Sequence, residues 1–295
     1  MPHNTKQTVS LVLGSGGARG LAHIGVIRWL EEHDFKIESI SGCSMGALVG
    51  GVYAAGKLDD FETWVRAITK VEIVRLLDLS WKMSGLVKGD KLFNRLTDIV
   101  GDVAIEQLPI RYTAVASDIA IEKEVWINSG QLFDAIRASI SLPLFFTPVR
   151  YRGSDLIDGG VLNPVPIAPT FNDNTDLTIA VNLGGKVSAS HDDVPDSEAK
   201  GESGRSIVAK VSDFVDNITT PKQGDTGPEW AAYDIANQAF DAMQSTIARQ
   251  KLAAYPADHL IEIARNACGT LDFDCAAEMI ELGYTKAQEQ LGDVT

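Results

Sequence analysis

Residues 37–56 read IESISGCSMGALVGGVYAAG and set the architecture of the chain. The β-branched lead-in predicts a strand, Gly42 and Gly46 bracket a tight turn, and the small apolar run after them predicts a helix. A serine at the tip of such a turn projects its hydroxyl clear of the sheet, next to a helix N-terminus that favours developing negative charge. Ser44 is therefore a candidate nucleophile, although a glycine-rich loop with an incidental serine fits the same letters.

The composition predicts a cytoplasmic α/β protein. The chain has 295 residues, 45% of them hydrophobic, which is enough to bury the core of one large domain or two small ones. No apolar run approaches the roughly 18 residues that a spanning helix needs. Residues 1–10 are polar and lack the apolar core of a signal peptide.

Charge and cysteine content narrow the range of partners. The net charge of −14 argues against nucleic acid and against electrostatic docking on anionic membranes. An apolar patch could still support transient contact with a membrane surface. The cysteines fit neither a disulfide framework nor a C-x-x-C metal pair; they are Cys43, Cys268 and Cys275.

A second glycine-rich loop, GSGGARG at 14–20, lies between a short apolar strand and a helical pattern. Such a loop presents free backbone N–H groups to an anion. The dinucleotide fingerprint fails because Arg19 stands where its third glycine is required, and no G-K-[ST] follows for a phosphate loop. An oxyanion hole formed by the amides of Gly16 and Gly17 is the better interpretation, with a plain tight turn as the alternative.

The remaining chain alternates strand and helix patterns without a repeat or a linker, so we expect 1–295 to form a single domain. Strands are expected at 9–13, 111–118, 123–127, 177–183 and 260–264, and helices at 21–33, within 59–103 and 129–149, and at 231–250 and 273–291. Core positions are expected at Trp64, Ile68, Val71 and Val74. Residues 184–229 are polar and acidic, which indicates a mobile insertion, either a disordered loop or a lid.

The segment LIDGGV at 156–161 supplies a candidate carboxylate. An acidic residue at a strand end followed by two glycines can place Asp158 at the carboxyl edge of a sheet, where Ser44 would also lie. A type I′ hairpin turn fits the Asp-Gly pair equally well.

A nucleophilic serine needs a base, and the sequence leaves two options open. Ser44, Asp158 and His259 (or His191) follow the chain order of an α/β-hydrolase triad. However, no histidine stands in a glycine-flanked loop after a strand, where the triad base usually lies. A carboxylate within hydrogen-bond reach can replace the histidine, although a carboxyl group with a pKa near 4 is a poor base at pH 7.

Taken in order, GSGGARG, GCSMG and IDGG resemble the patatin-like phospholipase family, and RASISLPLFFTPV and DGGVLNPVP extend the resemblance. The chain is most similar to compact bacterial cytosolic members, which are similar to the catalytic domain of neuropathy target esterase. The resemblance implies a three-layer α/β/α fold with a mostly parallel sheet. It also implies a Ser-Asp dyad that cleaves acyl esters without a metal, and we expect no metal and no cofactor.

Carried onto this sequence, the resemblance makes Ser44 the nucleophile and Asp158 the base. The amides of Gly16 and Gly17 would form the oxyanion hole, with Arg19 shaping the loop. Ser15 departs from the glycine that the family often has there. The substrate would be a phospholipid, a lysophospholipid or another fatty-acyl ester; the acyl chain length and the oligomeric state are not fixed by the sequence. A non-catalytic regulator on the same fold that binds lipid or protein is the alternative from another class.

Overall fold

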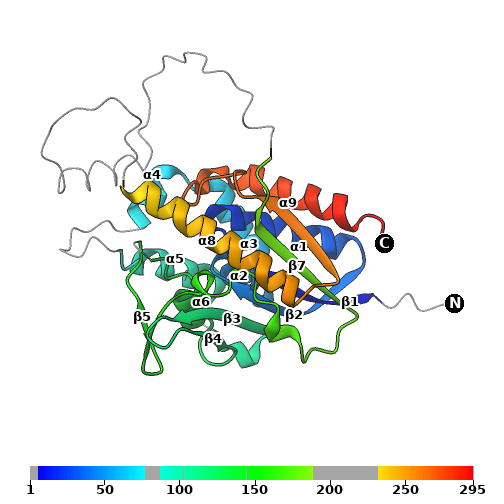
Figure 1. Cartoon of the computed structure of the whole chain (residues 1–295), viewed down its shortest axis with the longest axis horizontal. Helices are drawn as coiled ribbons and strands as arrows, with labels where there is room; N and C mark the ends of the chain where they lie inside the picture. Colours follow the sequence, from blue (N-terminus) through cyan, green and yellow to red (C-terminus); the bar gives the residue numbers. More distant parts are fainter. Residues whose placement is uncertain (1–5, 77–86, 102, 144, 189–231, 295) are drawn as a thin grey trace, which may run out of the picture.

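A central sheet with helices on both faces forms the body of the protein (Figure 1). The computed structural model describes residues 6–76, 87–101, 103–143, 145–188 and 232–294. The strand order is β5-β6-β3-β2-β1-β7-β8, with β4 also paired to β3. The strands are β1 Gln7–Leu13, β2 Phe35–Cys43, β3 Arg111–Asp118, β4 Lys123–Ile127, β5 Val149–Tyr151, β6 Ser154–Asp158, β7 Leu177–Gly185 and β8 His259–Ala264.

Most neighbouring strands run parallel. Strands β3, β2, β1, β7 and β8 form one continuous parallel array. Strands β4 and β6 pair antiparallel with β3, and β5 pairs antiparallel with β6. The expected α/β architecture with a mostly parallel sheet is confirmed.

The two faces of the sheet bury different cores. Leu11 and Leu13 of β1 point into the larger core, whereas Val12 points into a smaller one with Ala180 and Ala248, as the alternation along a strand requires. Helix α8 covers the smaller core, and α1 and α9 pack together on the larger one. The helices are α1 Ala22–Glu32, α2 Met45–Ala54, α3 Leu58–Ala67, α4 Lys70–Leu76, α5 Asp90–Val100, α6 Leu132–Ser139, α8 Ala232–Ala254 and α9 Ala276–Leu291, with a 3₁₀ helix η1 at Gly17–Leu21.

The strand predictions at 111–118 and 123–127 match β3 and β4 residue for residue. The strand expected at 177–183 is longer, because β7 keeps its pairing with β8 to Gly185. The polar segment therefore starts later than residue 184, and its larger part, 189–231, lies outside the described residues. Strand β5 was not predicted, because its three residues are too few to show a period.

One core prediction on the helices after α2 is wrong. Val71 is 59% exposed, because α4 turns only its other face inward, where Ile73 is buried. Trp64 and Ile68 are partly buried, as expected, and the side chain of Val74 is not among those that the structure describes. Within the described ranges, no helix has both the length and the apolarity to cross a bilayer.

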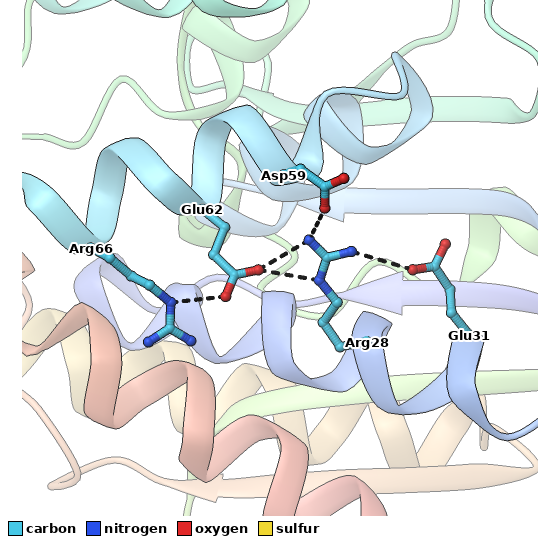
Figure 2. A network of polar contacts seen from close by, with 5 residues as sticks. All are labelled: Arg28, Glu31, Asp59, Glu62 and Arg66. Carbon is cyan, nitrogen blue, oxygen red and sulfur yellow. Dashed lines mark hydrogen bonds and ion pairs between the residues drawn. The ribbon is translucent and has the colours of Figure 1, made fainter.

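A network of charged side chains ties α3 to α1 (Figure 2). Arg28 of α1 donates from Nε and Nη2 to Glu62 Oε2 at 3.2 and 3.1 Å, and it also pairs with Asp59 and Glu31. Glu62 additionally accepts from Arg66 Nε at 2.8 Å. Glu62 is thus shared by two guanidinium groups and has only 18% of its side chain exposed.

We expect Glu62→Gln to lower the free energy of unfolding by about 1 kcal/mol, because it removes the charge that two arginines share in a partly shielded place. Urea denaturation measures the loss, which should shrink at high salt. The control is Glu38→Gln, which breaks a more exposed pair with Lys36 and should cost less than about 0.5 kcal/mol. Equal losses in both variants would contradict the prediction.

Candidate functional site

Ser44 occupies the sharp turn between β2 and α2. Its backbone has φ 55° and ψ −124°, a conformation that a residue with a side chain adopts at a cost of about 1–3 kcal/mol. Ser44 N donates to Ser139 Oγ at 2.9 Å, and that hydroxyl donates to Val115 O at 2.6 Å. The turn is also tight on its helical side, because a Cβ on Gly46 would lie 2.0 Å from Leu13 O. The glycine expected after the serine is therefore required by the packing.

The register of β3 explains why Asp158 meets Ser44. Strand β2 pairs with β3 up to Cys43, which is opposite Val115. From the next residue of β3 onward the partner is β6, with Asp158 opposite Ala116. Since β4 occupies the other edge of β3 over the same residues, β2 and β6 must lie on the same side and meet end to end. The residue after Cys43 consequently faces the last residue of β6.

The Ser44 hydroxyl donates to Asp158 Oδ2 at 2.6 Å. Asp158 Oδ1 accepts from Gly160 N at 2.7 Å, within the 3₁₀ turn that follows β6. The Asp-Gly pair thus leads into this turn and does not form the hairpin that the sequence also allowed. The carboxyl group is 1% exposed.

Burial raises the pKa of Asp158 to about 6, even though the hydrogen bonds from Ser44 and Gly160 oppose the shift. This corrects the expectation of an ordinary, weakly basic carboxylate. A group with this pKa is still mostly ionised at pH 7 and is a stronger base than a solvated aspartate. The thiol of Cys43 lies 3.9 Å from Asp158 Oδ1 and stays protonated, because burial and the neighbouring carboxylate raise its pKa.

The glycine loop, residues 14–20, lies beside the Ser44 turn. Ser15 N donates to Pro164 O and Ala18 N to Thr270 O, both at 2.8 Å. Among the described residues, the N–H groups of Gly16 and Gly17 have no such acceptor. Gly17 has φ 56° and lines the same cavity as Ser44. The two expected oxyanion donors are therefore free within the described chain.

Arg19 of the loop is buried, and its guanidinium group contacts the carboxyl-terminal segments. Its Nη1 donates to Arg265 O at 2.8 Å and to Cys268 O at 3.2 Å, and its Nη2 pairs with Asp241 of α8 at 3.3 Å. Arg19 thus links the loop to segments near the end of the chain; its role in shaping the loop stays a prediction.

An almost wholly apolar cavity of about 110 Å³ opens at Ser44. Many of its wall residues come from α3, α4 and α5 and from two loops, and the cavity was not predicted from the sequence. The helical spacing of these residues is the same for a cavity wall as for a packed core, so no local signal separates the two. The lining residues are Gly17, Leu21, Ser44, Met45, Leu48, Phe61, Trp64, Val65, Ile68, Ile73, Leu76, Leu92, Leu96, Ile140, Leu142, Phe145, Phe146, Thr270, Leu271 and Phe273.

The histidines of the described chain do not reach Ser44. His259 starts β8, three strands away from β2, which is about 14 Å across the sheet, and it lies toward the opposite end of the strands. His23 is buried against Gly14 O at 2.8 Å, and burial lowers its pKa to about 4. His33 stacks on a tryptophan of α1. His191 lies outside the described residues.

Comparison with known proteins gives a consistent family assignment. The profile of the patatin-like phospholipase family matches residues 11–171. Uncharacterized NTE family proteins of Mycobacterium tuberculosis and Mycobacterium bovis are 40% identical over 96% of this chain and 91% of their own length. Lysophospholipase NTE1 of Saccharomyces cerevisiae is 31% identical over 60% of this chain, which corresponds to 11% of the yeast protein.

The buried carboxyl group should make stability depend on pH in a defined direction. Its pKa is raised from 3.8 in the unfolded chain to about 6 in the folded protein, so the folded state binds more protons and this group's stabilisation is lost as the pH rises through about 6. Asp158→Asn removes that loss. We expect the free energy of unfolding of Asp158→Asn minus that of the wild type to be about 2 kcal/mol higher at pH 7.5 than at pH 4.5, so the variant gains relative stability as the pH rises.

Urea denaturation of both proteins at the two pH values measures this difference. The matched control is Asp155→Asn, an exposed carboxylate three positions earlier on β6, which should show no such change. A pH-independent effect of Asp158→Asn would mean that burial does not shift the pKa of this carboxyl group.

Proposed function

The chain belongs to the patatin-like phospholipase family, and we propose that it is a serine acyl hydrolase that cleaves fatty-acyl esters of phospholipids or lysophospholipids with Ser44 and Asp158. The observation that carries the proposal is the 2.6 Å hydrogen bond from Ser44 Oγ to Asp158 Oδ2 at the mouth of an apolar cavity. The description of the family, patatin-like phospholipase, points to lipid acyl hydrolysis. The two residues also fall within the segment that the family profile matches.

In the first half of the reaction, Ser44 Oγ attacks the ester carbonyl carbon while Asp158 takes the hydroxyl proton. The carbonyl oxygen becomes an oxyanion and accepts hydrogen bonds from the N–H groups of Gly16 and Gly17. The N-terminus of α2 adds a favourable potential there. The carbon–oxygen bond to the alcohol then breaks, Asp158 returns its proton to the departing oxygen, and Ser44 is left acylated.

In the second half, a water molecule takes the place of the alcohol. Asp158 accepts one proton of the water as its oxygen attacks the acyl carbon, and the same N–H groups hold the second oxyanion. The proton then passes to Ser44 Oγ, the fatty acid leaves, and the hydrogen-bonded pair is restored. The raised pKa of Asp158, about 6, suits a group that must both take and return a proton near neutral pH.

The cavity suits the acyl part of such a substrate. Its walls are aliphatic and aromatic side chains, and its lining includes both Ser44 and Leu48, which is one helical turn further along α2. An extended acyl chain bound there would leave its ester carbon beside Ser44 Oγ and its alcohol outside the apolar walls. The relatives named lysophospholipase act, as that name says, on esters of this kind.

We expect Ser44→Ala and Asp158→Asn each to reduce turnover of p-nitrophenyl esters and of lysophosphatidylcholine by at least about 10³-fold, because the nucleophile or its base is lost. His259→Asn should keep turnover within about twofold of the wild type. A fluorophosphonate probe should label the wild type at Ser44.

Loss of activity in His259→Asn with activity retained in Asp158→Asn would favour the α/β-hydrolase triad. A folded wild type that neither reacts with the probe nor turns over esters would favour the non-catalytic regulator.

A larger side chain in the wall contributed by α5 should shorten the acyl chains that bind. We expect Leu92→Trp to reduce kcat/KM for p-nitrophenyl palmitate by about tenfold or more and to leave the butyrate ester nearly unchanged, because a long acyl chain fills more of the cavity than a short one. The matched control is Ile99→Trp, on the same helix but outside the cavity lining. A parallel loss for both esters in Leu92→Trp would show that the cavity does not hold the acyl chain.

A further inference from the structure

Helix α8 turns polar side chains toward the sheet where an apolar stripe is usual. Gln244 is 8% exposed and Ser245 is 4% exposed, next to the apolar Ala248 on the same buried side. A buried amide is costly unless its polar atoms have partners. The partners of Gln244 therefore indicate what this position does.

The side-chain amide of Gln244 donates to the glycine loop. Its Nε2 lies 3.2 Å from Ser15 Oγ, and Ser15 directly precedes Gly16. The backbone N–H of Ser15 donates to Pro164 O at 2.8 Å. Gln244 thus fixes the residue that leads into the free N–H groups.

The same amide lies against the backbone beside Asp158. A Cβ built on Gly160 would be 2.2 Å from Gln244 Nε2 and 2.7 Å from Ser15 Oγ, so a side chain at this position would displace these two groups. The N–H of Gly160 is the one that donates to Asp158 Oδ1 at 2.7 Å. Gln244 therefore contacts both halves of the site, although no hydrogen bond to Ser44 or Asp158 is found in the described chain.

One turn earlier, α8 makes a second connection to the loop. Asp241 pairs with Arg19 at 3.3 Å, and the side chain of Arg19 is only 5% exposed. Positions three apart lie on one side of a helix, so Asp241 and Gln244 both face the loop and each contacts one of its residues. Both lie beyond residues 11–171, the segment that the family profile covers.

We propose that Gln244 is a positioning residue for acyl transfer, which sets the spacing between the N–H groups of Gly16 and Gly17 and the turn that holds Asp158. This role presupposes the acyl transfer by Ser44 and Asp158 proposed above. Gln244 is not among the residues that line the cavity. Its loss should therefore impair the chemical step and leave acyl-chain binding intact.

Gln244→Met keeps the length of the side chain and removes its hydrogen bond. We expect kcat for a p-nitrophenyl ester to fall by about tenfold or more, because small displacements of oxyanion donors have effects of this order, while KM stays within about twofold. Ser15→Ala removes the same hydrogen bond from the other side without altering α8. The double variant should lose no more than the more impaired single variant, because both changes break one interaction.

Two controls separate positioning from folding. The value of kcat is calculated per active site titrated with the fluorophosphonate probe. A smaller folded fraction of a variant therefore does not lower its kcat. Met243→Ala changes the preceding residue of α8, which is 56% exposed, and should leave kcat and KM unchanged.

A kcat per titrated site within about twofold of the wild type, in either Gln244→Met or Ser15→Ala, would overturn the positioning role. A raised KM at unchanged kcat, or losses that add in the double variant, would overturn it as well. A folded wild type that the probe does not label would instead remove the catalytic assignment of Ser44, and the role of Gln244 with it.

Discussion

The sharing of one edge of β3 between two strands is the constraint on which the site depends. Strand β2 pairs along the first part of this edge and β6, running in the opposite direction, along the last part. Their ends abut, so the chain must turn away sharply after each of them. Ser44 and Asp158 are the residues at these two turns, and the sheet itself brings the hydroxyl and the carboxylate together.

This arrangement also buries the carboxylate, with consequences for both stability and chemistry. Enclosing Asp158 between strand ends removes water from it and raises its pKa, which makes the folded protein less stable at neutral pH than a neutral side chain would. The same shift gives the carboxylate the basicity that its proposed role requires. The strained backbone of Ser44 is a second local cost at the same place, held by the hydrogen bonds of Ser139.

Much of the fold could be predicted from the sequence, because the parallel strands are short apolar runs and the helices between them are periodic. Ser44 and the glycine loop were also accessible, since each lies within one strand–turn–helix unit. The contact of Asp158 with Ser44 was not decidable from local pattern, because a hairpin fits the Asp-Gly pair as well and only the pairing of β6 excludes it. Gln244 and the cavity walls were missed for the same reason: their surroundings come from distant segments.

The glycine loop, near the start of the chain, is held by partners near its end. Arg19 and Arg265 are 246 positions apart, and Ser15 and Gln244 are 229 apart. Closing loops of this length is entropically costly, and contacts of such long range are slow to form. We therefore expect the loop to acquire its final shape late in folding. While the chain is still being synthesised, α8 and β8 have not yet emerged when the Ser44 turn has, so a nascent chain carries the serine without an organised site around it.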